Sequence, residues 1–80
     1  MPTVLRVRGY RFFFFSRETL EPPHIHVAQA ERYAKFWLDP VSVADVRGFR
    51  ANEMTEIRRI VVENAPLFLE RWYEYFNGES

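Results

Sequence analysis

Residues 12–15 are four consecutive phenylalanines, and this run constrains the fold more than any other feature of the sequence. The run lies near the end of the segment TVLRVRGYRFFFFS. In this segment two β-prone apolar runs flank Arg8-Gly9, which is typical of a β-hairpin with a tight turn. Side chains alternate between the two faces of a strand, so the four rings would occupy both faces. A strand with one face in water would alternate with polar residues, so this run predicts apolar cover on both sides.

The register of this hairpin follows from its turn. With residues 8–9 as the loop, Arg6 lies opposite Arg11 and Val4 opposite Phe13, and each cross-strand pair shares a face. Two arginines side by side repel each other unless an anion or an acidic group comes between them. We therefore consider Arg6 and Arg11 candidates for binding phosphate. The alternative is a solvated turn that contacts an acidic helix.

The remaining segments complete a predicted α+β fold. HIHVAQ and YAKFWL favour two strands joined around Ala30-Glu31, and residues 41–46 favour a short fifth strand or a helical turn. From about Ala51, apolar residues recur every three or four positions, which indicates one long amphipathic helix that Pro66 should bend or split. We expect a single domain over residues 1–80: a small antiparallel sheet of four to five strands, built from two hairpins, with the helix on one face.

Composition narrows the class of protein. The chain has no cysteine, which excludes disulfides and thiolate metal sites and favours a reducing compartment. Arginines interrupt the apolar N-terminal stretch, so it does not resemble a secretory signal, and no window approaches the length of a membrane span. We expect a cytoplasmic protein without membrane contact. The net charge of zero argues against a general nucleic-acid coat protein, although residues 1–17 carry four arginines and no acid.

His24 and His26 are the residues most suited to chemistry. They are two apart on a predicted strand, so both imidazoles project from one face, with their Cα atoms roughly 6.6 Å apart. Two imidazoles at this spacing can act as an acid–base pair or can bind a divalent metal such as zinc. The plainer alternative is a pair of histidines that simply lie at the surface or are hydrogen-bonded, without a chemical role. The other ligands of a metal site would come from Glu18, Glu21, Glu31, Asp39 or Asp45.

A polyanion site is a further interpretation of the same strand. If Ala30-Glu31 form the turn, His26 lies opposite Lys35 and His24 opposite Trp37, on one face. Together with the two arginines of the first hairpin, Lys35 and the histidines could bind an RNA phosphodiester and cleave it by proton transfer.

Several aromatic side chains could stack on the bases of such an RNA. Trp37 lies on a predicted strand, and Trp72, Tyr73 and Tyr75 lie on the predicted helix. Trp72 has helical spacing with Phe68 and favours the core, whereas Tyr73 and Tyr75 lie off that spacing and favour exposure.

The second face of the sheet raises the question of a partner. One helix covers one face, so Phe13 and Phe15 on the other face must be buried by curling of the sheet or by another polypeptide. We predict a partner interface at Phe13 and Phe15, formed with another protein or within a homo-oligomer.

The blocks MPTVLRVRGYRFFFFS, PPHIHV, AKFWLDPV and RGF, followed by a helix that ends in WYEYF, resemble a small bacterial and archaeal family. It is known as domain of unknown function 4160. The resemblance implies that Pro22, Pro23, His24 and His26 form the family's signature block, without a stated role. It also implies a neighbouring gene for another small domain, number 2442 in the same scheme, in pairs often labelled toxin–antitoxin modules. One departure is Arg50, where we expect a helix-capping residue such as serine.

We carry three hypotheses forward. The first is a partner-dependent component of a bacterial two-gene module of the toxin–antitoxin type, with any activity directed at RNA. The second is a non-enzymatic interaction module. The third is a metal-binding domain that uses His24 and His26. The sequence leaves open the side of the module, toxin or antitoxin, and the substrate.

Overall fold

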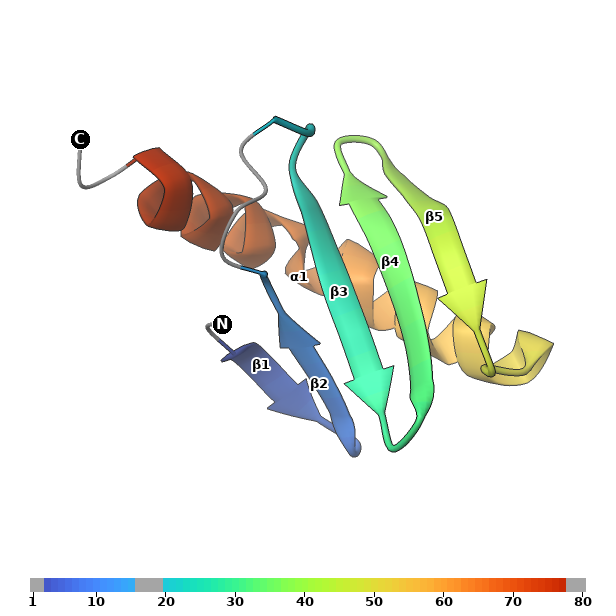
Figure 1. Ribbon diagram of the computed structural model, residues 1–80. Coiled ribbons are helices and arrows are strands. Elements are labelled where there is room, and N and C mark those ends of the chain that lie inside the picture. The colour runs from blue at the N-terminus through green and yellow to red at the C-terminus, as the bar shows by residue number, and fades with distance from the viewer. Residues whose placement is uncertain (1–2, 16–19, 78–80) are drawn as a thin grey trace.

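A five-stranded antiparallel sheet packs with one face against a single long helix (Figure 1). The computed structural model describes residues 3–15 and 20–77. The strands follow one another in chain order across the sheet, which confirms the predicted α+β fold. The elements are β1 Thr3–Val7, β2 Tyr10–Phe13, β3 His24–Gln29, β4 Arg32–Leu38, β5 Val41–Arg47 and α1 Ala51–Asn77.

The first hairpin has the predicted turn. Arg8 and Gly9 both have positive φ, 54° and 83°, as a two-residue hairpin turn of type I′ requires. Arg6 faces Arg11 as expected, but the register shifts between Thr3 and Leu5, so Thr3 rather than Val4 pairs with Phe13. The expected Val4–Phe13 pair was therefore wrong, because a bulge places an extra residue in β1.

The second hairpin and the fifth strand follow from equally short turns. Ala30 has a φ of 54°, and Gln29 pairs with Arg32 around the predicted loop. Residues 41–47 form the edge strand β5 and not a helical turn. The pairing of β4 with β5 shifts between Lys35 and Phe36, so a second bulge lies at this edge of the sheet.

The helix begins without a capping hydroxyl. Its first hydrogen bond joins the Met54 amide to the Arg50 carbonyl at 2.9 Å. The Glu53 carboxylate accepts a hydrogen bond from the Arg50 amide at 2.8 Å, which is half of a capping box and partly replaces the missing serine. The helix is continuous over 27 residues, so of the two expected effects of Pro66, a bend or a split, the split does not occur. Packing of its apolar face against the sheet offsets the loss of one backbone hydrogen bond at proline.

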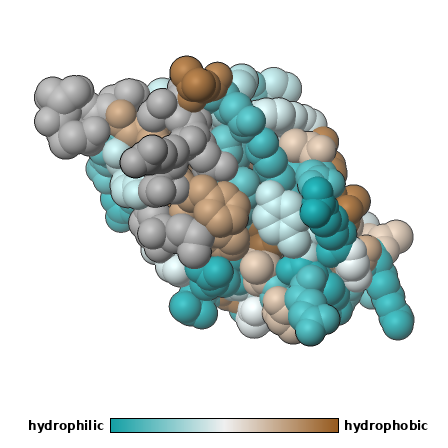
Figure 2. Space-filling model, in the orientation of Figure 1, coloured by the Kyte–Doolittle hydropathy of each residue, from teal (hydrophilic) through white to brown (hydrophobic). Residues whose placement is uncertain are grey.

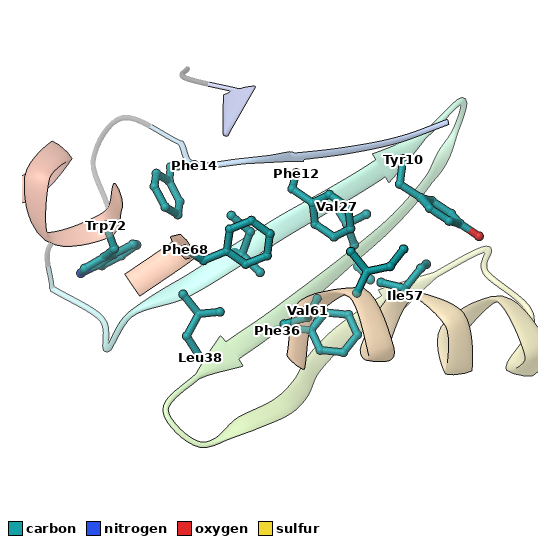
Figure 3. Close-up of a cluster of buried hydrophobic side chains, with 13 residues drawn as sticks. Tyr10, Phe12, Phe14, Val27, Phe36, Leu38, Ile57, Val61, Phe68 and Trp72 are labelled. Carbon is teal, nitrogen blue, oxygen red and sulfur yellow. The ribbon is translucent and has the colours of Figure 1, made fainter. Parts of the chain in front are cut away.

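The core lies between the sheet and α1 (Figure 3). Phe12 stacks on Phe68 of the helix with ring centroids 5.5 Å apart, and Phe14 meets Trp72 edge to face at 5.4 Å. These long-range aromatic pairs dock the C-terminal half of the helix on β2. Within residues 3–15 and 20–77, no helix has the length and apolar character needed to cross a membrane.

Candidate functional site

The face of the sheet turned away from α1, here called the outer face, carries an aromatic and imidazole cluster. The register places Phe13 beside His26, His26 beside Lys35, and His24 beside Trp37 on this face. Figure 2 shows the outer face, with an apolar surface near its middle between polar strips. The chain therefore has a second apolar layer, on the side of the sheet opposite α1.

The two imidazoles lie side by side, as the strand periodicity predicted. The ring centroids of His24 and His26 are 4.9 Å apart, with the ring planes at 90°. Their exposed fractions are only 0% and 3%. The pair is therefore enclosed, whereas a solvated histidine surface would have left both rings accessible.

His24 is oriented by the backbone and by the helix. Its Nδ1 lies 2.9 Å from the carbonyl oxygen of Pro22, and because a carbonyl can only accept, Nδ1 carries the hydrogen. β2 ends at Phe13, which pairs with His26, so no β2 residue pairs with His24. At that end of the sheet the Trp72 ring lies against His24, with centroids 4.8 Å apart.

His26 is enclosed by three aromatic rings. Phe13 and Tyr33 stack against it with centroids 5.5 Å and 5.8 Å away, and Phe15 meets it edge to face at 4.5 Å. Its Nδ1 lies 2.8 Å from the Tyr33 hydroxyl, which can donate or accept according to the tautomer. This arrangement holds the imidazole in one orientation.

An ion pair forms the polar rim of the cluster. The Lys35 ammonium donates to the Glu21 carboxylate at 2.7 Å and lies over the Trp37 ring, 4.6 Å from its centroid. The hydrogen bond from Lys35 holds the pKa of Glu21 below its usual range. Glu21 also lies 3.7 Å from His24 Nδ1. The lysine predicted for a polyanion site therefore already has a carboxylate partner.

The two arginines predicted to bind an anion are neighbours on the outer face. Arg11 lies over the Phe13 ring, 4.2 Å from its centroid, and donates to the Thr3 hydroxyl at 3.4 Å. Arg6 is exposed and forms no ion pair with the described part of the chain. The expected contact between the turn and the acidic helix is made instead by Arg8, whose guanidinium lies 2.9 Å from Glu56.

The potential metal ligands do not converge in the part of the chain that the structure describes. No group of three or more His, Asp or Glu side chains there could hold a metal ion. Glu18, one of the predicted ligands, lies outside the described residues. From the predicted set, the described structure brings together the two histidines and places Glu21 beside His24, but these three do not form a group that could hold one metal ion.

The predicted interface residues differ in their accessibility. Phe13 is 3% exposed, because His26, Phe15 and Arg11 cover its ring, whereas Phe15 is 40% exposed. Of the helix aromatics, Trp72 is buried in the core, and Tyr73 and Tyr75 are 50% and 37% exposed, as expected from their spacing. The accessible aromatic surface of the outer face is therefore centred on Phe15.

Sequence reasoning missed Tyr33 and one contact of Trp72. Tyr33 pairs with Ala28, one step diagonally from His26, so the predicted register could have identified it. Trp72 was predicted for the core, but its contact with His24 has no local signal, because it joins positions far apart in the chain.

Comparison with known proteins identifies one matching family. The model of a family described as "Domain of unknown function (DUF4160)" matches residues 9–73. Neither the curated proteins nor the solved structures contain a match. The matched span begins at the first hairpin turn and ends in α1, and it includes both histidines and most of the outer face.

Proposed function

Since the chain belongs to this family of domains of unknown function, we propose from its own surfaces that it is the partner-binding component of a bacterial two-gene module of the toxin–antitoxin type. In this proposal the partner is a protein, and it docks on the outer face around Phe15. The chain acts by association and not by chemistry at its histidines. Its proposed compartment is the cytoplasm, in keeping with the absence of cysteine.

One observation carries the proposal: an exposed phenylalanine stands at the rim of an ordered aromatic layer. Phe15 is 40% exposed, yet its ring is positioned edge to face on both Phe13 and His26. A rigid, partly exposed aromatic side chain loses little conformational entropy on binding, which suits an interface anchor. Arg6 and Arg11 lie on the same face and favour a partner segment that offers carboxylates beside an apolar side chain.

Docking on a face is favoured over the addition of a strand. Both edge strands carry a bulge, in β1 near Val4 and in β5 near Ala44. At the β5 edge the Asp45 carboxylate also accepts the Val46 amide at 2.9 Å. Bulges and side chains that occupy edge amides hinder pairing with a further strand.

The burial of the histidines favours a protein partner over RNA cleavage. General acid–base catalysis requires each imidazole to reach the substrate within hydrogen-bond distance. With exposed fractions of 0% and 3%, neither ring of the pair offers such access to a phosphodiester.

The test is co-expression with the product of the neighbouring gene, followed by purification and a measured dissociation constant. We expect a complex, and we expect Phe15→Ser to raise the dissociation constant by at least about tenfold. Val43→Ser is the matched control, because Val43 has a similar exposed fraction, 46%, but lies on edge strand β5. A complex that tolerates both changes equally, or no complex at all, contradicts the proposal.

A second arm distinguishes the RNA hypothesis. If expression of the protein alone slows growth, and His24→Ala with His26→Ala relieves the effect while the folded chain and the complex persist, RNA-directed chemistry is favoured. Growth inhibition that depends on Phe15 and not on the histidines supports partner binding.

A further inference from the structure

The first hairpin holds two like charges on neighbouring strands of the outer face. Arg6 of β1 lies directly opposite Arg11 of β2, and we call these two residues the arginine pair. The next residue in the same row across the sheet is Ala28 of β3, which brings no charge. Directly opposed residues have Cβ atoms about 4.5–5.5 Å apart, and like charges at that spacing destabilise the pairing of the strands. The hairpin therefore carries a repulsion that an anion between the two guanidinium groups would relieve.

The arginine pair differs from the other cations of the sheet. Within residues 3–15 and 20–77, neither Arg6 nor Arg11 forms an ion pair, and the hydrogen-bond acceptor of Arg11 is the neutral Thr3 hydroxyl, at 3.4 Å. The other basic side chains of the strands and their turns each contact a carboxylate: Arg8 with Glu56, Arg32 with Glu53, Lys35 with Glu21 and Arg47 with Asp45.

The acidic side chains of the sheet do not supply the anion that the arginine pair lacks. Glu21 and Asp45 lie at the outer face, but cations of β4 and β5 already engage them. Glu31 is exposed in the β3–β4 turn, at the same end of the sheet as the first hairpin turn, and contacts neither member of the pair (Figure 1). Asp39 lies in the β4–β5 turn at the opposite end (Figure 1). The described chain therefore leaves the pair without a counter-charge.

We propose that the arginine pair is a carboxylate site that takes one acidic side chain of the protein partner, an inference that rests on the proposed function. A guanidinium donates through a planar fork that matches the two oxygens of a carboxylate. One carboxylate placed between Arg6 and Arg11 accepts hydrogen bonds from both. Its attraction to each guanidinium then offsets the repulsion within the pair.

The carboxylate site lies close to the exposed aromatic side chain of the same face. Arg11 Cζ is 4.2 Å from the ring centroid of Phe13, and the rings of Phe13 and Phe15 have centroids 5.2 Å apart. The Arg11 guanidinium and the Phe15 ring are therefore less than about 10 Å apart. In the partner, an acidic and an apolar side chain should be separated by about one to two turns of a helix, or by about two to three residues of a strand.

The arginine pair suits a single carboxylate better than the backbone of an RNA. An RNA strand carries one phosphate per nucleotide, so its binding requires cations that continue along the backbone. Beyond the pair, Lys35 and Arg47 hold the carboxylates of Glu21 and Asp45, and these acids repel further phosphates. The outer face thus offers free positive charge for one anion and not for a chain of them.

The first experiment titrates the chain alone with sodium acetate to about 100 mM and follows the arginine Nε–H signals by NMR, a range that detects dissociation constants above about 1 mM. The signals of Arg6 and Arg11 should shift along a saturating curve, and sodium chloride at the same ionic strength should not reproduce it. Arg58 and Arg59 are the matched control, because they are adjacent, exposed cations of α1 that likewise form no ion pair in the described part of the chain. No shift at the arginine pair, or an equal shift at the control arginines, overturns the proposal.

The second experiment measures the dissociation constant of the complex with the product of the neighbouring gene. Arg6→Gln with Arg11→Gln should raise it at least about tenfold, because the partner's carboxylate loses both donors. Arg58→Gln with Arg59→Gln removes the same charge from α1 and should change it less than about twofold. A complex that depends on Phe15 but tolerates the loss of the arginine pair overturns this inference and leaves the proposed function standing. If no complex forms, the proposed function fails together with the partner's side chain, and the acetate titration still decides whether the pair binds a carboxylate.

RNA binding is the alternative outcome. A fluorescent single-stranded RNA of about 12 nucleotides, titrated at about 150 mM salt, should show no binding that depends on the arginine pair. Tight RNA binding that Arg6→Gln with Arg11→Gln abolishes would assign the site to phosphate and would overturn the carboxylate.

Discussion

Replacement of Phe13 by alanine tests whether the outer face is a second core of this chain alone. Phe13 lies on the side of the sheet opposite α1, yet it is only 3% exposed. Phe12, its neighbour in the run, is fully buried beneath α1 and stacks on Phe68. If the outer layer is packed as the structure describes, truncation of either phenylalanine to alanine should lower the free energy of unfolding by a similar amount.

The expected cost can be worked out from these contacts. Truncation of a buried phenylalanine to alanine costs about 3–5 kcal/mol, and an aromatic pair contributes about 0.5–1.5 kcal/mol of interaction. Phe13 loses its edge-to-face contact with Phe15 and its cation contact with Arg11, both of which lie near solvent. We therefore expect about 3 kcal/mol for Phe13→Ala, at the lower end of the range. An 80-residue domain has a total stability of about 4–12 kcal/mol.

Urea unfolding followed by circular dichroism measures this cost. With a slope of about 1 kcal/mol per M for a small domain, Phe13→Ala should lower the midpoint by about 3 M or abolish the folded baseline. Phe12→Ala should do the same, and Phe15→Ala, at 40% exposure, should cost clearly less. A cost below about 1 kcal/mol for Phe13→Ala would refute the reasoning, because it would mean that the chain alone does not pack its outer layer.

Three further changes test the helix start, a turn and the core. The Arg50 amide and Arg32 hold the pKa of the Glu53 carboxyl below its ordinary value, so the ionised carboxylate stabilises the fold at pH values above that ordinary pKa. This contribution is lost as the pH falls through the lowered pKa, so the free energy of unfolding, measured by urea titration, should decrease less at acid pH for Glu53→Gln than for the wild type. An equal decrease in the two proteins would contradict the assignment. Gly48→Ala should lower the free energy of unfolding by about 1–3 kcal/mol in the same assay, because the φ of Gly48 is +90° and the new Cβ would lie 2.9 Å from Arg32 Cγ. An unchanged free energy of unfolding would rule out that backbone conformation. Burial and the hydrogen bond to Glu56 raise the pKa of Tyr10. The wild type should therefore lose stability as the pH rises from about 10 through the raised pKa of Tyr10 in the folded protein, and Tyr10→Phe should lose less. If the free energy of unfolding falls equally with pH in both proteins, Tyr10 is not the cause.

The sequence predicted the elements and most of the pairing. Arg8-Gly9 and Ala30-Glu31 identify the two hairpin turns, and the turns fix the observed facing of Arg6 with Arg11, and of His26 with Lys35. The placement of both imidazoles on one side of β3 followed from the same periodicity. The bulge in β1 escaped prediction, because the sequence near Val4 carries no glycine or other signal for an extra residue.

Local chemistry determined by itself which segments become strands or helix, since turn conformation and side-chain alternation depend on residues only a few positions apart. The tertiary structure alone decided the burial of the candidate site. Trp72 of the helix meets His24, and residues of β2 and β4 enclose the imidazole pair. Arg32 of β4 donates to the second oxygen of the Glu53 carboxylate at 2.6 Å and so joins the start of the helix to the sheet. Such contacts join distant parts of the chain, and their energies depend on how the layers pack and not on any short pattern of residues.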